Sequence, residues 1–135
     1  MKKNLFIIAV ALSTLASATP LENYLQSLKK EAKAENPTFK DFSAKRGKEI
    51  FFSKHIGKKG KEVSCVSCHT TNLRDTGENL FTGKTIKPLS LAVNPKRLSN
   101  LKKMKKWLRR NFKDVYKREG TPLEKGDVLV FIQSQ

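Results

Sequence analysis

Apolar side chains recur at helical spacing in several parts of this chain and predict amphipathic helices there. Between residues 20 and 35 they repeat at steps of three or four, and Asn36-Pro37 ends the pattern. A second helix is expected from a cap at Ser43 to about Lys54. Its inner face includes Gly47, and a glycine within a helix costs about 1 kcal/mol relative to alanine. We therefore expect another helix to cross closely at Gly47.

Two further helices are expected in the C-terminal third. The run 95–98 can form a short helical turn, and Ser99 can cap a longer helix that extends to about Lys113. A last helix begins at the capping box of Thr121-Pro122-Leu123-Glu124, although residues 128–132 alone could be a strand. It should direct three side chains against the Gly47 helix: Leu123, Val130 and Phe131. Residues 55–64 and 70–92 lack periodicity and are expected to be loops.

The helix predicted after Ser99 has one polar residue within its apolar face. Asn111 lies in that face, while lysines and arginines fill the opposite side. A buried amide without a partner costs about 1–3 kcal/mol, so Asn111 needs something to bind. A backbone group, a carboxylate of a bound cofactor or a metal ion would each satisfy it. The apolar positions of this face are Leu98, Leu101, Met104, Leu108, Phe112 and Val115.

The N-terminus has the pattern of a secretory signal. Lys2 and Lys3 precede an apolar run over residues 5–12, and Ala16-Ser17-Ala18 is a small-residue cleavage site. The run is too short to span a bilayer, although an uncleaved membrane anchor is the alternative. We expect a signal over residues 1–18, an N-terminal helical extension over 19–42 and a single domain over 43–135. The mature protein would then be periplasmic and not an integral membrane protein.

Charge sets the kind of partner expected. The formal net charge of the 135-residue chain is +16. Such a charge is typical of nucleic-acid binding, but export argues against that function. An acidic protein partner or anionic lipid heads remain, with association rates that fall as salt rises. The basic side of the Asn111 helix is either a docking surface for an acidic redox partner or a solvated helix face.

The clearest chemical motif is Cys65-Val66-Ser67-Cys68-His69. C-x-x-C-H is the attachment pattern of a c-type haem. Two thiols one helical turn apart can add to the two vinyl groups on one edge of the porphyrin, and the next residue places an imidazole beneath the iron. Cys65 and Cys68 are therefore the candidate attachment sites for one haem c, and His69 is the candidate proximal ligand.

Two other chemistries use the same residues. A thioredoxin-like C-x-x-C requires alternating strands and helices, which this chain lacks. A structural zinc site requires four ligands, a number that Cys65, Cys68, His69 and His55 could supply. Adjacent residues such as Cys68 and His69 rarely reach one tetrahedral ion, however. Haem attachment is the favoured interpretation.

Two residues near the motif have candidate supporting roles. His55 could be a distal ligand, but a solvated histidine in a flexible loop is the favoured expectation. Pro88 could present its carbonyl to the Nδ1–H of His69 and fix the ring, or it could form a simple turn.

These helices around C-x-x-C-H resemble the all-α class I cytochrome c fold. Most members of that class use methionine as the distal ligand, and Met104 is the one methionine after the signal. Such methionines usually lie in an irregular loop, whereas Met104 lies within a predicted helix. From residue 43 onward the chain more closely resembles the sphaeroides haem protein family of high-spin c-type cytochromes. The matching residues are Thr82-Gly83-Lys84, Ile86, Pro88-Leu89, Trp107-Leu108, Arg110-Asn111 and Thr121-Pro122.

This resemblance implies a specific distal ligand. The asparagine of the family's W-L-x-R-N run falls on Asn111, and two cysteines that form a disulfide in the best-known member are Phe112 and Gly120 here. The distal segment is therefore expected to be more mobile. A neutral amide is a weak, hard donor that suits ferric better than ferrous iron. We expect Asn111 to leave on reduction and to open a site for O2, NO or CO.

The resemblance also implies the class of function. We expect an electron-transfer cytochrome whose reductants are a dihaem cytochrome c and a membrane cytochrome b. The alternative is an ordinary low-spin His/Met shuttle that uses Met104. No distal His and Arg pair is committed to cleaving peroxide, so a dedicated enzyme is not expected.

Overall fold

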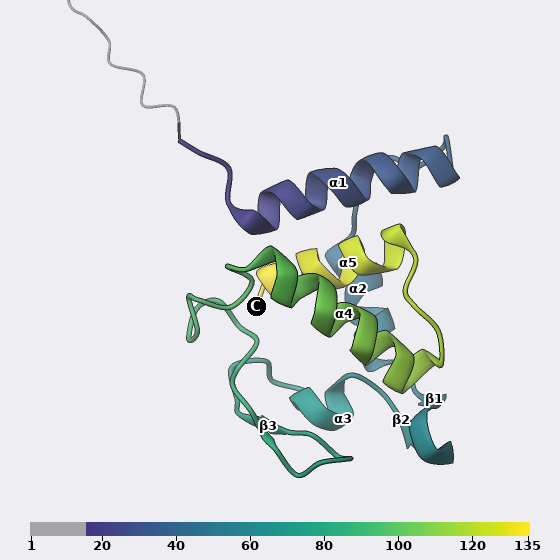
Figure 1. Cartoon of the computed structure of the whole chain (residues 1–135), viewed down its shortest axis with the longest axis vertical. Helices are drawn as coiled ribbons and strands as arrows, with labels where there is room; N and C mark the ends of the chain where they lie inside the picture. The colour runs from purple at the N-terminus through teal and green to yellow at the C-terminus, as the bar shows by residue number, and fades with distance from the viewer. Residues whose placement is uncertain (1–15) are drawn as a thin grey trace, which may run out of the picture.

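The computed structural model describes residues 16–135 and is built mainly of helices, as predicted (Figure 1). Its strands form two antiparallel pairs of two residues each, β1 with β2 and β3 with β4. Residues 1–15, which make up most of the predicted signal, lie outside the described residues. In chain order the elements are α1 (Pro20–Glu35), α2 (Ala44–Phe52), β1 (His55–Ile56), the 3-10 helix η1 (Lys58–Gly60), β2 (Glu62–Val63), α3 (Val66–His69), β3 (Gly77–Glu78), β4 (Thr85–Ile86), α4 (Leu101–Tyr116) and α5 (Pro122–Gln133).

Helix starts follow local capping chemistry. The Thr121 hydroxyl accepts from the Glu124 backbone N–H, and the Glu124 carboxylate accepts from the Thr121 N–H, which confirms the predicted capping box. The Ser43 cap of α2 is also confirmed. The predicted Ser99 cap is wrong: the Asn100 side chain caps α4 by accepting from the backbone N–H of Lys103 at 2.9 Å. Residues 95–98 form turns and no helix.

Helices α2 and α5 cross at Gly47, as expected. A Cβ atom added to Gly47 would lie 2.8 Å from Cβ of Phe131, so only glycine admits this approach. Beside the crossing, the carboxylate of Asp127 is buried and accepts from Nε of Arg46 at 2.7 Å and from the backbone N–H of Ser43 at 2.7 Å. This pair of a buried carboxylate with an exposed guanidinium ties the start of α2 to α5.

The inward face of α5 differs from the prediction. Phe131 is buried, but Leu123 and Val130 are only partly buried. Their neighbours Val128 and Leu129 occupy the core instead. The helix is buried around much of its circumference, so a single amphipathic face does not describe it.

The N-terminal helix packs on the rest of the protein, as expected. Figure 1 shows α1 lying along α5 and α4. Its inner face is buried through Leu21, Tyr24, Leu28 and Ala32. Within residues 16–135, no helix combines the length and the apolar character that crossing a membrane requires.

Two predicted loops contain paired strands. His55 pairs with Val63 across the first hairpin, and Gly77 pairs with Ile86 across the second. Both strands of each pair are only two residues long, too short for an alternating hydrophobic pattern to reveal them. The second hairpin lies against α3 and positions the C-x-x-C-H motif.

Candidate functional site

The C-x-x-C-H motif forms one turn of helix. Cys65 precedes α3 as its cap, and Cys68 and His69 end the helix. The His69 backbone N–H donates to the Cys65 carbonyl at 3.1 Å, which closes the turn and places both thiols on one side of it. Both cysteines are free thiols.

The β3–β4 hairpin holds this turn from outside. The backbone N–H of Leu80 donates to Sγ of Cys68 at 3.4 Å. Gly77 packs so closely that an added Cβ would lie 3.1 Å from the carbonyl carbon of Cys68 and would overlap its oxygen. The hairpin therefore leaves α3 little freedom to move on that side.

Burial keeps the Cys65 thiol and the His69 imidazole uncharged. Burial, with a smaller effect from the neighbouring Cys68, raises the pKa of the Cys65 thiol to about 12. Burial, with a smaller effect from the Arg97 guanidinium, lowers the pKa of His69 to about 4. A neutral imidazole has the free lone pair that a metal ligand needs.

These residues fit a covalently attached haem. Two free thiols on one helical turn match its two vinyl groups, and a neutral, buried imidazole follows them directly. The ring of His69 packs against Phe51, with ring centroids 5.9 Å apart. Its Nδ1 is buried and makes no hydrogen bond within the described residues.

The proposed role of the Pro88 carbonyl is not borne out. The oxygen already accepts from Nδ2 of Asn94 at 2.9 Å and from Nε of Arg97 at 3.1 Å. These two donors use both lone pairs, so none remains for Nδ1 of His69. The sequence did not predict that Arg97 donates to this carbonyl, because Arg97 lies in a turn, where no periodic pattern marks it.

Asn111 lies at the edge of the buried face of α4. Its side chain is partly exposed, and its amide makes no hydrogen bond to any of residues 16–135. Met104 is buried on nearly the same side of the helix, two turns earlier. The structure therefore keeps both candidate distal ligands on one helix face.

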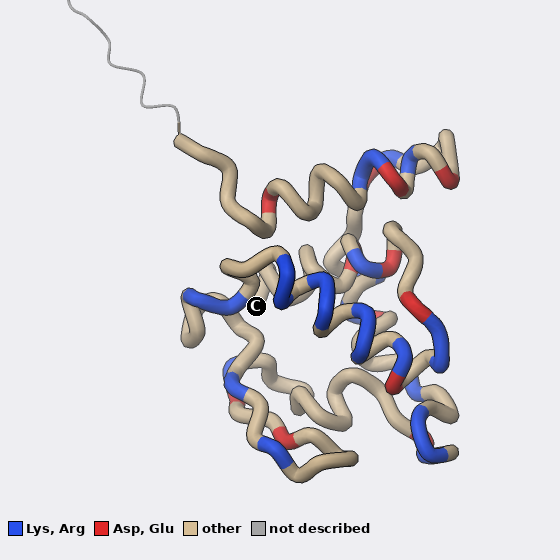
Figure 2. The backbone as a smooth tube through the Cα atoms, in the orientation of Figure 1, with Lys and Arg blue, Asp and Glu red and all other residues tan. Residues whose placement is uncertain are grey.

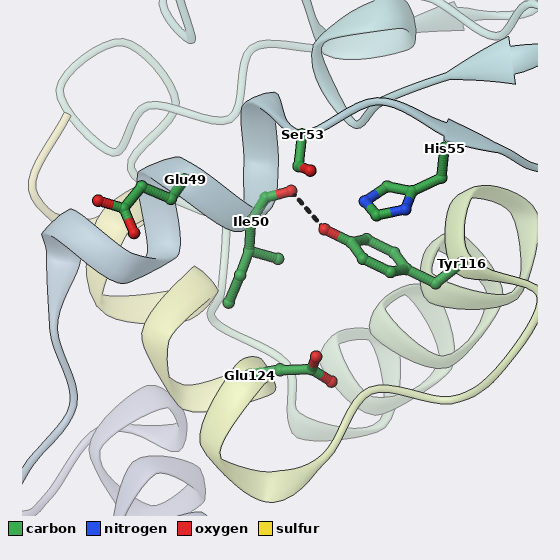
Figure 3. Close-up of a pocket in the computed structure, with 6 residues that line it drawn as sticks. All are labelled: Glu49, Ile50, Ser53, His55, Tyr116 and Glu124. Atoms are coloured by element: carbon green, nitrogen blue, oxygen red, sulfur yellow. Dashed lines mark hydrogen bonds between the residues drawn. The ribbon is translucent and has the colours of Figure 1, made fainter.

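His55 is not a solvated loop residue. Its imidazole stacks on Tyr116 with ring centroids 4.1 Å apart, and its Nε2 is buried without a partner among the described residues. Figure 3 shows the two rings side by side at a pocket of about 230 Å³. The Tyr116 hydroxyl donates to the Ile50 carbonyl at 2.7 Å, linking the end of α4 to α2. Sequence reasoning also missed Tyr116, although its place one turn after Phe112 marks it as a packing position.

The two positions that are cysteines in the best-known family member lie against each other. A Cβ on Gly120 would lie 2.8 Å from three ring atoms of Phe112. A close aromatic contact thus occupies the place where the resemblance would put a disulfide.

The alternative chemistries find no support in this arrangement. In the part of the chain that the structure describes, no three or more His, Cys, Asp or Glu side chains gather in a way that could hold a metal ion. The imidazole of His55 stacks on Tyr116. The strands are isolated two-residue pairs, so there is no thioredoxin-like βαβ unit in residues 16–135.

A mainly helical domain with C-x-x-C-H on a single helical turn defines a class I c-type cytochrome. The family described as "Domain of unknown function (DUF1924)" matches residues 37–132. Cytochrome c'' from Methylophilus methylotrophus is 30% identical over 130 residues, which cover 96% of this chain and 90% of that protein. Cytochrome c-type protein SHP from Cereibacter sphaeroides is 37% identical over 92 residues, which cover 68% of this chain and 70% of that protein. The chain belongs to the DUF1924 family and, within the c-type cytochromes, to the group of cytochrome c'' and SHP.

Solved structures agree with this assignment. Oxidized cytochrome c'' from Methylophilus methylotrophus superimposes with a TM-score of 0.76 over 86% of this chain and 94% of that one. Oxidized SHP, described as an oxygen-binding cytochrome c, superimposes with a TM-score of 0.75 over 88% of this chain and 100% of that one. Both are 30% identical to this chain.

Proposed function

We propose that this protein is an exported, periplasmic monohaem cytochrome whose haem is held by Cys65, Cys68 and His69, with Asn111 as a weak and displaceable distal ligand. The single observation that carries the distal assignment is the unpaired amide of Asn111 beside the buried face of α4. The name of SHP, as an oxygen-binding cytochrome, supports a role that includes small diatomic ligands. The proposed function is electron transfer, with binding of O2, NO or CO in the reduced state.

Each residue has a distinct task in this proposal. The thiols of Cys65 and Cys68 would form the covalent attachment, and α3 fixes their spacing. His69 offers a neutral nitrogen and is held in place by its contact with Phe51. When bound, the haem supplies one-electron redox chemistry and a coordination position for a diatomic ligand. Asn111 would occupy that position in the ferric protein and would leave it on reduction, because an amide oxygen is a hard donor.

Met104 defines the alternative, a low-spin shuttle with a thioether ligand. It is buried on the same helix face as Asn111, and a soft sulfur would bind ferrous iron well and exclude small ligands. Its burial is equally that of a core residue, since Met104 packs in the same apolar cluster as Leu28 of α1 and Leu129 of α5.

Absorption spectra of three proteins distinguish the two ligands. We expect the wild type to be high-spin when ferrous and to shift its bands on adding carbon monoxide. Met104→Leu, which conserves core volume, should keep both spectra. Asn111→Ala should change the ferric spectrum. An unchanged ferric spectrum in Asn111→Ala, or a sulfur-to-iron band that Met104→Leu removes, would assign the ligand to Met104 instead.

The proposed redox partner is acidic. A dihaem cytochrome c and a membrane cytochrome b are the reductants that the family resemblance suggests. Figure 2 shows Lys and Arg recurring along α4, the helix that carries Asn111. Steering by this charge predicts that the reduction rate falls as salt is raised, and a rate independent of salt would reject the docking role.

A further inference from the structure

Arg97 lies in the turns between β4 and α4 and differs from the other arginines in residues 16–135. Its side chain is partly buried, whereas the others are exposed: Arg46, Arg74, Arg109, Arg110 and Arg118. Two of these exposed arginines nevertheless pair at 2.7 Å with a carboxylate, that of Asp127 or that of Glu124. Arg97 has no carboxylate within 4.0 Å in the described chain, and residues 79–113 contain no Asp or Glu. It is therefore a partly buried cation without an acidic partner.

Two backbone carbonyls hold the guanidinium in place. Its Nε donates to the Pro88 carbonyl at 3.1 Å, and its Nη2 donates to the Lys87 carbonyl. A neutral carbonyl satisfies an N–H group but does not neutralise the charge, and burial lowers the pKa of Arg97. Its Nη1 makes no hydrogen bond within the described residues. The buried side-chain nitrogens that lack a partner there belong to His55 and His69, so Nη1 of Arg97 is open to an incoming group.

The same turns bring this charge to the candidate proximal ligand. Directly after Pro88, the backbone N–H of Leu89 donates to the Leu73 carbonyl at 3.0 Å. Leu73 is buried and lies four residues after His69. The Arg97 charge is close enough to act on the His69 imidazole, whose pKa it helps to lower after the larger effect of burial. Arg97 therefore carries its charge beside the residues that fit a haem.

We propose that Arg97 binds a propionate carboxylate of the covalently attached haem. This role rests on the proposed haem attachment at Cys65, Cys68 and His69, and it does not depend on which residue is the distal ligand. A guanidinium presents a planar fork of donors that matches a carboxylate. The thiols hold the vinyl edge of the porphyrin, whereas Arg97 holds the opposite edge, which carries the propionates. The partly buried cation thereby gains the carboxylate that the chain itself does not supply.

This contact also affects the reduction potential of the haem. Ferric haem carries one more positive charge than ferrous haem, so an unneutralised propionate nearby favours the ferric state. Removing the guanidinium should therefore lower the midpoint potential. A lysine at this position would keep the charge but present a single ammonium group in place of the fork. The effects of charge and of donor geometry can thus be separated.

The test uses the purified holoprotein and four variants. Arg97→Gln removes both the charge and the fork, and Arg97→Lys retains the charge. Asn94→Ala removes the other donor to the Pro88 carbonyl, which it contacts at 2.9 Å, and controls for loosening of the turns. Arg74→Gln removes the same charge from an exposed arginine five residues after His69. Resonance Raman spectra follow the bending mode of the haem propionates, and redox titration at fixed pH and ionic strength measures the midpoint potential.

We expect the propionate bending mode to shift in Arg97→Gln, to shift less in Arg97→Lys and to stay in place in both controls. The potential of Arg97→Gln should fall by about 59 mV, which corresponds to a tenfold change in a one-electron equilibrium. Arg97→Lys should keep most of the wild-type potential, because it keeps the charge. If Arg97→Gln does not yield folded holoprotein, the propionate mode of Arg97→Lys decides, since lysine can still donate to the Pro88 carbonyl.

An unchanged propionate mode in both Arg97 variants would overturn the proposal. Equal shifts in Arg97→Gln and Asn94→Ala would also overturn it, because only the shape of the turns would then matter. A potential that falls as far in Arg74→Gln as in Arg97→Gln would mean that net charge alone sets it. The pyridine haemochrome spectrum reports covalent attachment separately. A wild type without attached haem would overturn the proposed function itself, whereas an unresponsive propionate mode in haem-loaded protein rejects the role of Arg97 alone.

Discussion

Replacing Gly47 by alanine tests the helix crossing on which the domain is built. The added Cβ would lie 2.5 Å from the Asp127 carbonyl carbon and 2.8 Å from Cβ of Phe131, whereas ordinary contact begins at 3.4 Å. Helices α2 and α5 must therefore move apart by about 1 Å. A gap of that size forfeits roughly a quarter to a half of the dispersion energy between the facing side chains.

We expect Gly47→Ala to destabilise the protein by about 2–3 kcal/mol. Overpacking and the opened interface together cost about 3–4 kcal/mol. The better helix propensity of alanine returns about 1 kcal/mol. Urea unfolding of the holoprotein, followed by far-UV circular dichroism and by the Soret band, measures the difference. Lys45→Ala, at an exposed position of the same helix, should stay within about 0.5 kcal/mol of the wild type. A Gly47→Ala protein as stable as the wild type would refute the close crossing.

Three further changes probe the contacts around this interface, each measured by urea unfolding. Asp127→Ala removes the buried carboxylate that accepts from the exposed Arg46 and from the Ser43 backbone N–H, and should cost about 1–3 kcal/mol; a loss as small as that of a surface substitution would contradict these contacts. Tyr116→Phe removes one hydrogen bond between α4 and α2 and should cost about 1 kcal/mol, with no change expected in the ferric spectrum. Hydrogen bonds with Arg118 lower the pKa of Glu124 from its usual value of 4.5. The Glu124 carboxylate therefore contributes its full stabilisation at a pH above 4.5, and this contribution is lost as the pH falls through the lower pKa of the folded state. Stability profiles of the wild type and Glu124→Gln against pH should therefore converge in acid, and profiles that stay parallel would contradict the linkage.

Local chemistry in the sequence was sufficient to predict that the helices exist and to start α2 and α5 correctly, but not to find the Asn100 cap of α4. Caps act within three or four residues, so Ser43 and Thr121 mark the starts of their helices without knowledge of the rest of the chain. Gly47 predicts a close helix crossing, because glycine destabilises a helix interior and is seldom found there without a packing reason. The haem motif is likewise local, since its two thiols and its imidazole occupy five consecutive residues.

Tertiary structure decided which partners these residues meet. His55 meets Tyr116, and Pro88 meets Asn94 and Arg97, through chain folding that no short-range pattern encodes. The two hairpins depend on pairings six to nine residues apart between strands too short to show a period.

The basic side of α4 shows the same division. Its helical spacing is visible in the sequence, and it predicts one continuous charged face. Only the packing of α1 against α4 and α5 separates that face into two parts, one that lines a groove with α1 and an open flank that includes Lys103 and Arg110. The sequence alone determined where the charge lies along the helix. The fold decided which charges line the groove, because a groove needs walls from elements that are distant in the chain.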